Sequence, residues 1–209
     1  MRMEPAMDLV ADMARPHCLA AAARILFVVM AIAAWAAPGP VQSAGPADAS
    51  AETVVIVVRH AEKLVPADAG KSMADEDPPL TPAGERRAAA IADALADARI
   101  AAVYSTPYRR TMQTAAPLAA RAGVVVTSYE PKSDPAEFAR QVTTAHRGAT
   151  VLVVGHSNTV PGIVAAFAGM PVESMDDTIY GRVYVITVGA DGKARLLRMG
   201  FPPYATDAQ

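Results

Sequence analysis

Cysteine is almost missing from this sequence of 209 residues, and its scarcity limits the chemistry open to the chain. The one cysteine, Cys18, lies in an N-terminal segment that we predict to be removed. The remaining domain then has no disulfide, no reactive thiol and no cysteine-based metal site. HxH and HExxH spacings, which would indicate histidine ligands for zinc, are also absent from the sequence.

A strong charge of either sign is missing as well. The formal net charge is −2, so nothing favours broad binding to nucleic acid. Charged residues make up 19% and hydrophobic residues 52%, which argues against wholesale disorder. Aromatic residues are few, at 5%, and alanine is abundant, a composition that suits helices packed through small side chains. The length predicts one domain with a tail.

The chain has one apolar run near its N-terminus, ILFVVMAIAAWAA at 25–37, behind Arg15 and Arg24. Residues rich in proline, glycine, alanine and serine follow it, a pattern typical of a secretory signal peptide. The run is short for a membrane span of about 20 residues. We therefore predict a signal peptide and linker at 1–50 and an exported domain, periplasmic or secreted, at 51–209. The alternative is an anchor formed by an uncleaved N-terminal segment.

From residue 52 onward, strand patterns alternate with helix patterns. This alternation predicts an α/β fold with three layers, α/β/α, around a central, mostly parallel sheet. The runs TVVIVV (53–58) and TVLVV (150–154) are apolar throughout and should be central strands. We expect further strands at 100–104, 124–127, 183–188 and 194–199, and helices at 82–99, 109–122, 135–146 and 160–168.

Both central strands end in a histidine. Arg59-His60 follows the first strand, and His156 comes just after the second. In open α/β sheets this edge is where ligands bind. Arg109 and Arg110 begin a helix at the same edge, where the helix dipole favours anions, not cations. An anion bound between the arginines would remove that conflict, and guanidinium groups suit phosphate.

These residue types have a shared use in phosphoryl transfer. Histidine is a competent nucleophile and forms covalent intermediates. Arginines and a second, protonated histidine would stabilise the charge on a transferred phosphoryl group. The leaving oxygen then needs a proton from a nearby carboxylic acid.

The sequence resembles the histidine phosphatase superfamily, whose fold is phosphoglycerate mutase-like. The family's Arg-His-Gly appears as Arg59-His60-Ala61, with alanine in place of glycine. Its block S-S-P-x-x-R-A-x-Q-T-A appears as STPYRRTMQTA, its G-H-S as Gly155-His156-Ser157, and its L-T-x-x-G within DPPLTPAGERRA. The four blocks occur in the family's order between Val54 and Phe167.

The resemblance implies a role for each matching residue. His60 would be the phosphate-accepting nucleophile, and Arg59, Arg110 and His156 would complete the phosphate pocket. Aligning the second block on its Q-T selects Arg110 as the catalytic arginine and leaves Arg109 at the surface or facing substrate. The implied activity is hydrolysis of a phosphomonoester or phosphoprotein through a phosphohistidine on His60, without a cofactor.

The short domain also narrows the expected substrates. It has no room for the long insertions of sugar-phosphate mutases, so it resembles the small bacterial phosphatases, including phosphohistidine and lipopolysaccharide-core-phosphate types. The expected partner is a phosphorylated small molecule, glycan or protein, with no nucleic acid and no stable membrane association after signal cleavage.

The general acid is the least determined residue. The resemblance places a glutamate after the third strand, which favours Glu130. Glu62 and Asp77 in the first loop are alternatives, and Asp134 also occurs here, although its position suits a helix cap.

Two other functions stay open at this stage. A non-catalytic phosphate-binding module would keep the pocket but have no working acid. A metal hydrolase using His60, Glu62 and His156 is weaker, because two neighbouring arginines would repel a dication.

Overall fold

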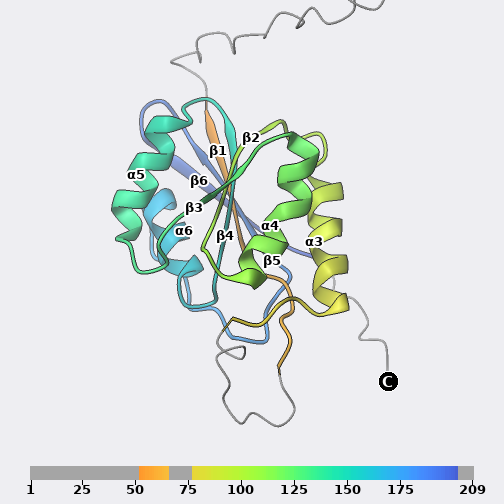
Figure 1. Cartoon of the computed structure of the whole chain (residues 1–209). Coiled ribbons are helices and arrows are strands. Elements are labelled where there is room, and N and C mark those ends of the chain that lie inside the picture. The colour runs from red at the N-terminus through yellow and green to blue at the C-terminus, as the bar shows by residue number, and fades with distance from the viewer. Residues whose placement is uncertain (1–51, 66–76, 202–209) are drawn as a thin grey trace, which may run out of the picture. The chain divides into compact units, whose positions relative to one another are not determined.

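The structure, a computed structural model, describes residues 52–65 and 77–201. The predicted signal peptide and linker at 1–50 lie outside these residues. A six-stranded sheet lies between two layers of helices, as the sequence predicts (Figure 1). In the part of the chain described, no helix has the length and apolar character needed to cross a membrane.

The described elements follow one another along the chain as strands and helices. The strands are β1 (Thr53–Arg59), β2 (Ile100–Ser105), β3 (Val126–Ser128), β4 (Thr150–Gly155), β5 (Arg182–Val188) and β6 (Ala194–Gly200). The helices are α3 (Pro82–Ala94), α4 (Arg109–Ala122), α5 (Pro135–Ala145) and α6 (Val160–Ala168).

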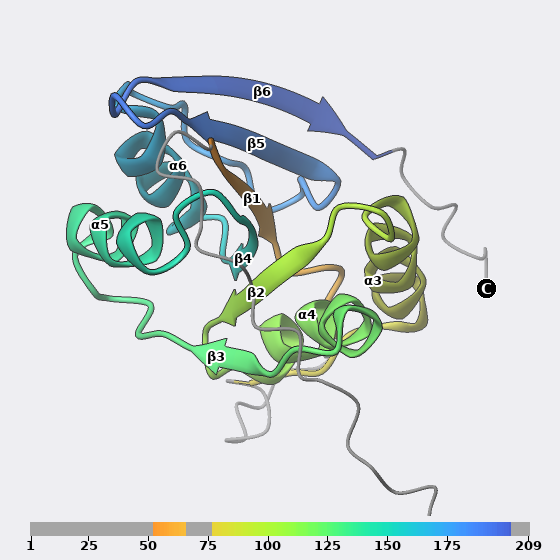
Figure 2. The ribbon, with the colours of Figure 1, turned by 90° about the horizontal axis from the view of Figure 1, so that it is seen from above.

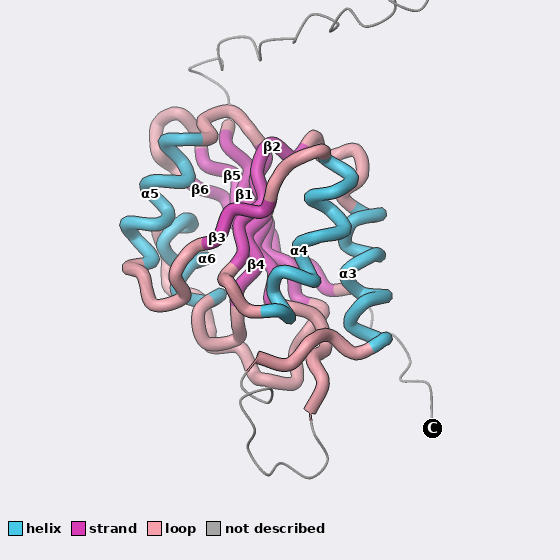
Figure 3. Tube along the Cα trace, in the orientation of Figure 1, coloured by secondary structure: helices cyan, strands magenta, loops and turns pink. Residues whose placement is uncertain are grey.

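The sheet has the strand order β3-β2-β4-β1-β5-β6. The pairs β1–β4, β2–β4 and β2–β3 are parallel, whereas β5 runs antiparallel to both β1 and β6. The two apolar strands therefore lie at the centre, and the last two strands form the predicted hairpin. The loops after β1, β2 and β4 consequently meet at one end of the sheet (Figure 3).

Helices α3 and α4 cover one face of the sheet, and α5 and α6 cover the other (Figure 2). Alternate residues of β1 supply the two cores. Val55 and Val57 pack toward α5 and α6, and Ile56 and Val58 pack toward α4. Burial on both faces explains why this strand is apolar throughout.

Two elements differ from their predicted limits. Helix α3 ends at Ala94, not at residue 99, because Leu95 caps it and Arg99 takes a left-handed conformation with a φ of 47°. Strand β3 begins at Val126, two residues later than predicted, because the backbone N–H of Val124 still closes α4 by donating to the Ala119 carbonyl.

The beginning of α3 explains the sequence block L-T-x-x-G. The Thr81 hydroxyl accepts a hydrogen bond from the Gly84 N–H at 3.1 Å, and the Thr81 N–H donates to the Glu62 carbonyl at 2.9 Å. A Cβ on Gly84 would lie 2.2 Å from that carbonyl oxygen. The absence of a side chain at Gly84 therefore lets α3 pack directly on the chain that leaves β1.

Replacing Gly84 by alanine should destabilise the protein by about 1–3 kcal/mol, because the methyl group overlaps the Glu62 carbonyl. Gly162 in α6 is the matched control, since its Cβ would meet only Pro135 Cγ at 3.5 Å. Gly162→Ala should be neutral or stabilising by up to about 1 kcal/mol. Urea unfolding of both variants checks this, and equal effects would contradict it.

Candidate active site

A cavity of about 880 Å³ opens at the end of the sheet where β1, β2 and β4 finish. All four residues predicted for the phosphate pocket line it, namely Arg59, His60, Arg110 and His156. The pairing of β1 with β4 places Arg59 opposite Gly155, so the residue after each, a histidine, lies at the same level. The two imidazole rings lie with their centroids 5.4 Å apart.

His60 is held as a neutral imidazole with one nitrogen available. Its Nδ1 lies 2.8 Å from the Ala61 carbonyl oxygen, which only accepts hydrogen bonds, so Nδ1 carries the proton. Burial lowers the pKa of His60 to about 3, and the charges of Arg59 and Arg110 act in the same direction. Nε2 therefore keeps a free lone pair, the state required of a nucleophile.

The alanine that replaces the family's glycine has a packing role. Ala61 is fully buried in a small cluster with Leu80 and Ala88. Its methyl group fills space between the segment after β1 and helix α3, so the replacement leaves the neighbouring His60 in place.

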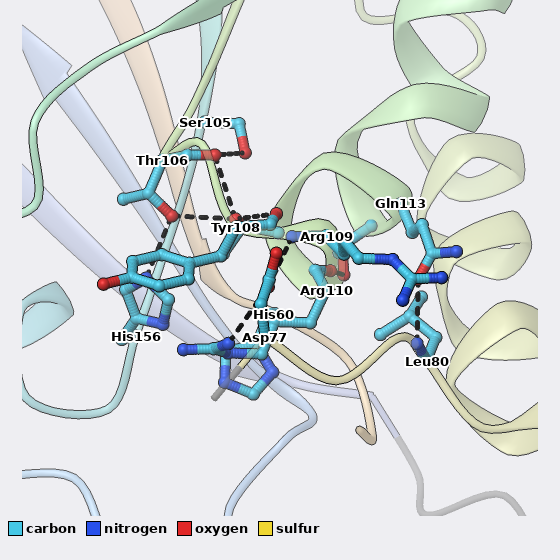
Figure 4. Close-up of polar contacts among 12 residues, drawn as sticks. His60, Asp77, Leu80, Ser105, Thr106, Tyr108, Arg109, Arg110, Gln113 and His156 are labelled. Carbon is cyan, nitrogen blue, oxygen red and sulfur yellow. Dashed lines mark hydrogen bonds and ion pairs between the residues drawn. The ribbon is translucent and has the colours of Figure 1, made fainter. Parts of the chain in front are cut away.

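The Q-T pair of the second block joins this same region to helix α4. The Gln113 side-chain oxygen accepts a hydrogen bond from the Leu80 N–H at 2.8 Å (Figure 4). The Thr114 hydroxyl accepts from the Ala61 N–H at 3.0 Å. These two contacts fix the segments on either side of residues 66–76 against the helix that carries Arg110.

His156 is anchored by a chain of hydroxyl groups. Its Nε2 lies 2.9 Å from the Thr106 hydroxyl, which lies 2.7 Å from the Thr111 hydroxyl (Figure 4). Burial lowers the pKa of His156 to about 4, helped by Arg110 and Arg59. The second histidine is therefore neutral in the empty site, and its protonation beside a transferred phosphoryl group stays a prediction. A bound phosphate dianion would raise this pKa.

Arg59 is 3% exposed, and the segment between α6 and β5 surrounds it. Its Nη1 donates to the carbonyl oxygens of Asp177 at 2.7 Å and Ile179 at 3.1 Å. Its guanidinium carbon lies 4.1 Å from the centre of the Tyr180 ring. Sequence reasoning missed this segment, 176–180, because no motif or periodicity there pointed to a partner for Arg59.

Arg110 lies in the cavity, whereas Arg109 is exposed and is not among the described residues that line it. The Arg110 guanidinium packs 4.5 Å from the centre of the Tyr108 ring, and its Nη1 lies 3.5 Å from a carboxylate oxygen of Asp77. Within the described residues, the buried Nε atoms of Arg59 and Arg110 have no acceptor. An anion between the two arginines would satisfy such donors.

Two of the four candidate acids are occupied in structural contacts. Both carboxylate oxygens of Glu62 accept from Arg87 Nε at 2.9 Å, which ties the segment after β1 to α3. Asp134 caps α5 through a 3.0 Å hydrogen bond from the Ala136 N–H. The cluster of His60, Glu62 and His156 considered for a metal is not assembled. No group of three potential ligands among His, Cys, Asp and Glu occurs in the described residues.

The other two candidates lie outside the cavity wall. Asp77 accepts from the Arg109 N–H at 2.8 Å and so faces the N-terminus of α4. Glu130 is exposed and is not among the described residues that line the cavity. The structure therefore brings together the two histidines and two arginines, and it leaves Glu130 apart from them.

The sequence of residues 55–132 matches the family model described as "Histidine phosphatase superfamily (branch 1)". This region carries His60, Arg59 and Arg110, which the structure places around one cavity with His156. Residues 55–132 of the chain therefore carry the sequence signature of the histidine phosphatase superfamily.

A curated relative matches part of the chain. The chain is 40% identical over 89 residues to "Uncharacterized protein Rv0525" of Mycobacterium tuberculosis, a match that covers 42% of this chain and 43% of that relative. The match thus spans less than half of the relative's length.

Several solved structures share the fold. The protein histidine phosphatase SixA complexed with tungstate superposes with a TM-score of 0.56 at 19% identity, over 70% of this chain and 96% of that chain. YhfR of Bacillus stearothermophilus gives a TM-score of 0.55 at 19% identity, over 69% and 95% of the two chains. Mycobacterial glucosyl-3-phosphoglycerate phosphatase Rv2419c gives 0.54 at 13% identity, over 69% and 97%.

The two neutral histidines should make this histidine phosphatase fold sensitive to acid. Their folded pKa values, about 3 and about 4, lie below the unfolded value of 6.5, so the unfolded chain takes up protons first as the pH falls. Stability should be lost from pH 6.5 down to about 4 for His156 and about 3 for His60, by about 2 kcal/mol per histidine at pH ~5. Urea unfolding in phosphate-free buffer measures this. The double variant His60→Gln/His156→Gln should show a flatter profile, and an unchanged slope would contradict the assignment.

The adjacent arginines offer a matched test of the phosphate pocket. Arg110→Ala should weaken binding of inorganic phosphate or tungstate by about 10- to 100-fold, because it removes a charge-assisted partner from the cavity. Arg109→Ala should change binding by less than about threefold, since it removes an exposed charge. Isothermal titration of the two variants checks the pair. Equal losses would show that both arginines act only through their general charge.

Proposed function

We propose that this protein is a phosphatase that hydrolyses a phosphomonoester or phosphoprotein through a covalent phosphohistidine on His60. The observation that carries the proposal is the state of His60, which is neutral, donates Nδ1–H to its neighbour's carbonyl and lines a cavity with two arginines. This combination supports a nucleophile aimed at a phosphorus atom.

The first step would form a bond between Nε2 of His60 and phosphorus and break the bond to the leaving oxygen. The charge on the phosphoryl oxygens would be stabilised by the guanidinium groups of Arg59 and Arg110. His156, neutral before binding, gains a proton more readily once the dianion is present and then adds a third cation. Water would release phosphate from His60 in the second step.

The cavity sets broad limits on the substrate. It is larger than a phosphate ion and is lined beyond the histidines by Lys63, Pro161, Val172 and Tyr180. A phosphorylated small molecule, glycan or protein side chain would place its phosphate at the arginines and its remainder along this wall. We place the enzyme outside the cytoplasm, periplasmic or secreted, because of the apolar segment at 25–37.

The test is phosphatase turnover by the full-length protein and its His60→Ala variant. Removal of the nucleophile should lower kcat by about 1,000-fold or more and abolish an acid-labile phosphoryl label on the protein. His146→Ala is the matched control, because His146 bonds the Tyr104 hydroxyl at the end of α5 and lies outside the cavity wall. It should keep near wild-type activity.

Two results would contradict the proposal. Equal turnover by wild type and His60→Ala would exclude a phosphohistidine on this residue. Tight phosphate binding without turnover on any phosphorylated substrate would instead indicate a non-catalytic phosphate-binding module of the same fold.

A further inference from the structure

One carboxylate does line the cavity, although sequence patterns did not select it. Of the described residues in the cavity wall, Asp177 alone is acidic. It lies in the segment between α6 and β5, and its side chain is 85% exposed. Its carboxylate can therefore contact both bulk water and a bound substrate.

Two neighbours of the phosphate pocket hold Asp177 in place. Its carboxylate oxygen accepts a hydrogen bond from the hydroxyl of Ser157, the residue directly after His156. The same oxygen lies 3.6 Å from Nη2 of Arg59, while its backbone carbonyl accepts from Nη1 at 2.7 Å. A phosphate bound to Arg59 would thus lie beside this carboxylate.

Given the phosphatase activity proposed above, we infer that Asp177 is the proton-transfer residue of both chemical steps. In the first step, Nε2 of His60 bonds to phosphorus, the P–O bond to the leaving group breaks, and the Asp177 carboxyl gives its proton to that oxygen. In the second step, the Asp177 carboxylate takes a proton from water as the water oxygen bonds to phosphorus and the N–P bond breaks. Asp177 is thus protonated again when the product phosphate forms, as it was in the complex with the substrate.

The charges around Asp177 suit this exchange. The hydrogen bond from Ser157 and the charges of Arg59 and Lys63 lower the pKa of Asp177, against the opposing charge of Asp176. The group is therefore a carboxylate in the empty site. An arriving phosphate dianion adds negative charge and takes up part of the Arg59 field, so its binding raises the pKa and favours the proton-bearing acid.

The neighbouring aspartate provides a control of the same chemistry. The Asp176 carboxylate accepts from the Thr178 N–H at 2.7 Å and from the Thr178 hydroxyl at 2.6 Å. It is not among the described residues that line the cavity. Asp176 and Asp177 thus differ in position and not in charge or residue type.

The experiment compares Asp177→Asn, Asp176→Asn and Glu130→Gln on an alkyl phosphate and on p-nitrophenyl phosphate. The nitrophenolate leaves without a proton, whereas an alkoxide needs one. Asp177→Asn should lower kcat/KM for the alkyl phosphate by about 100-fold or more and for p-nitrophenyl phosphate by less than about 10-fold. The other two variants should stay within about threefold of wild type on both substrates.

A second measurement separates chemistry from structural damage. Asparagine can still accept from Ser157, and the backbone carbonyl that holds Arg59 is unchanged. Inhibition by tungstate should therefore be as strong or stronger in Asp177→Asn, because one negative charge has left the site.

The outcomes distinguish this inference from the proposed function. Equal losses on both substrates, weakened tungstate inhibition, or the selective loss in Glu130→Gln instead would each overturn the role of Asp177 while His60 stays essential. Turnover that persists in His60→Ala would overturn both.

Discussion

The parallel pairing of β1 with β4 is the constraint on which the site depends. Its register sets Arg59 opposite Gly155, and the hydrogen bond from the His60 N–H to the Gly155 carbonyl, 2.9 Å long, extends the pairing by one residue. Two histidines from segments about a hundred residues apart are thereby brought side by side. Because β1 is buried on both faces, a slip of one residue would move each of its side chains from one core cluster into the other, where the packing differs.

Burial next to arginines then determines the protonation states. A buried imidazolium beside two guanidinium groups is unfavourable, so both histidines are neutral in the empty site. For His60, neutrality provides the lone pair that attack requires. For His156, it means that in the proposed mechanism the ring would gain its positive charge only when a phosphate dianion binds. Burial beside the two arginines thus lowers the pKa of both histidines, while the roles proposed for His60 and His156 differ.

Features of the fold that depend on residues close together in the chain could be predicted from the sequence. The apolar runs, the caps at Thr81 and Asp134 and the histidines at the strand ends depend on near neighbours in the chain, and the structure shows each of them. Contacts between distant segments could not be read this way. Arg59 donates to the carbonyl of Ile179, 120 residues away. Glu62 accepts from Arg87 only because α3, which carries Arg87, packs on the segment after β1. Asp177, the carboxylate in the cavity wall, belongs to this second class, whereas Glu130 was selected by the family resemblance.

The segment at 176–180 both holds Arg59 in position and carries Asp177. Its carbonyl oxygens and the ring of Tyr180 fix one side of the guanidinium during folding, so little side-chain freedom is left to lose when an anion binds. The unpaired Nε stays available to a ligand. A guanidinium placed in advance stabilises charge without reorganisation at the moment of reaction. Asp177 belongs to the same segment. The contacts that hold Arg59 in position therefore also place a carboxylate beside it.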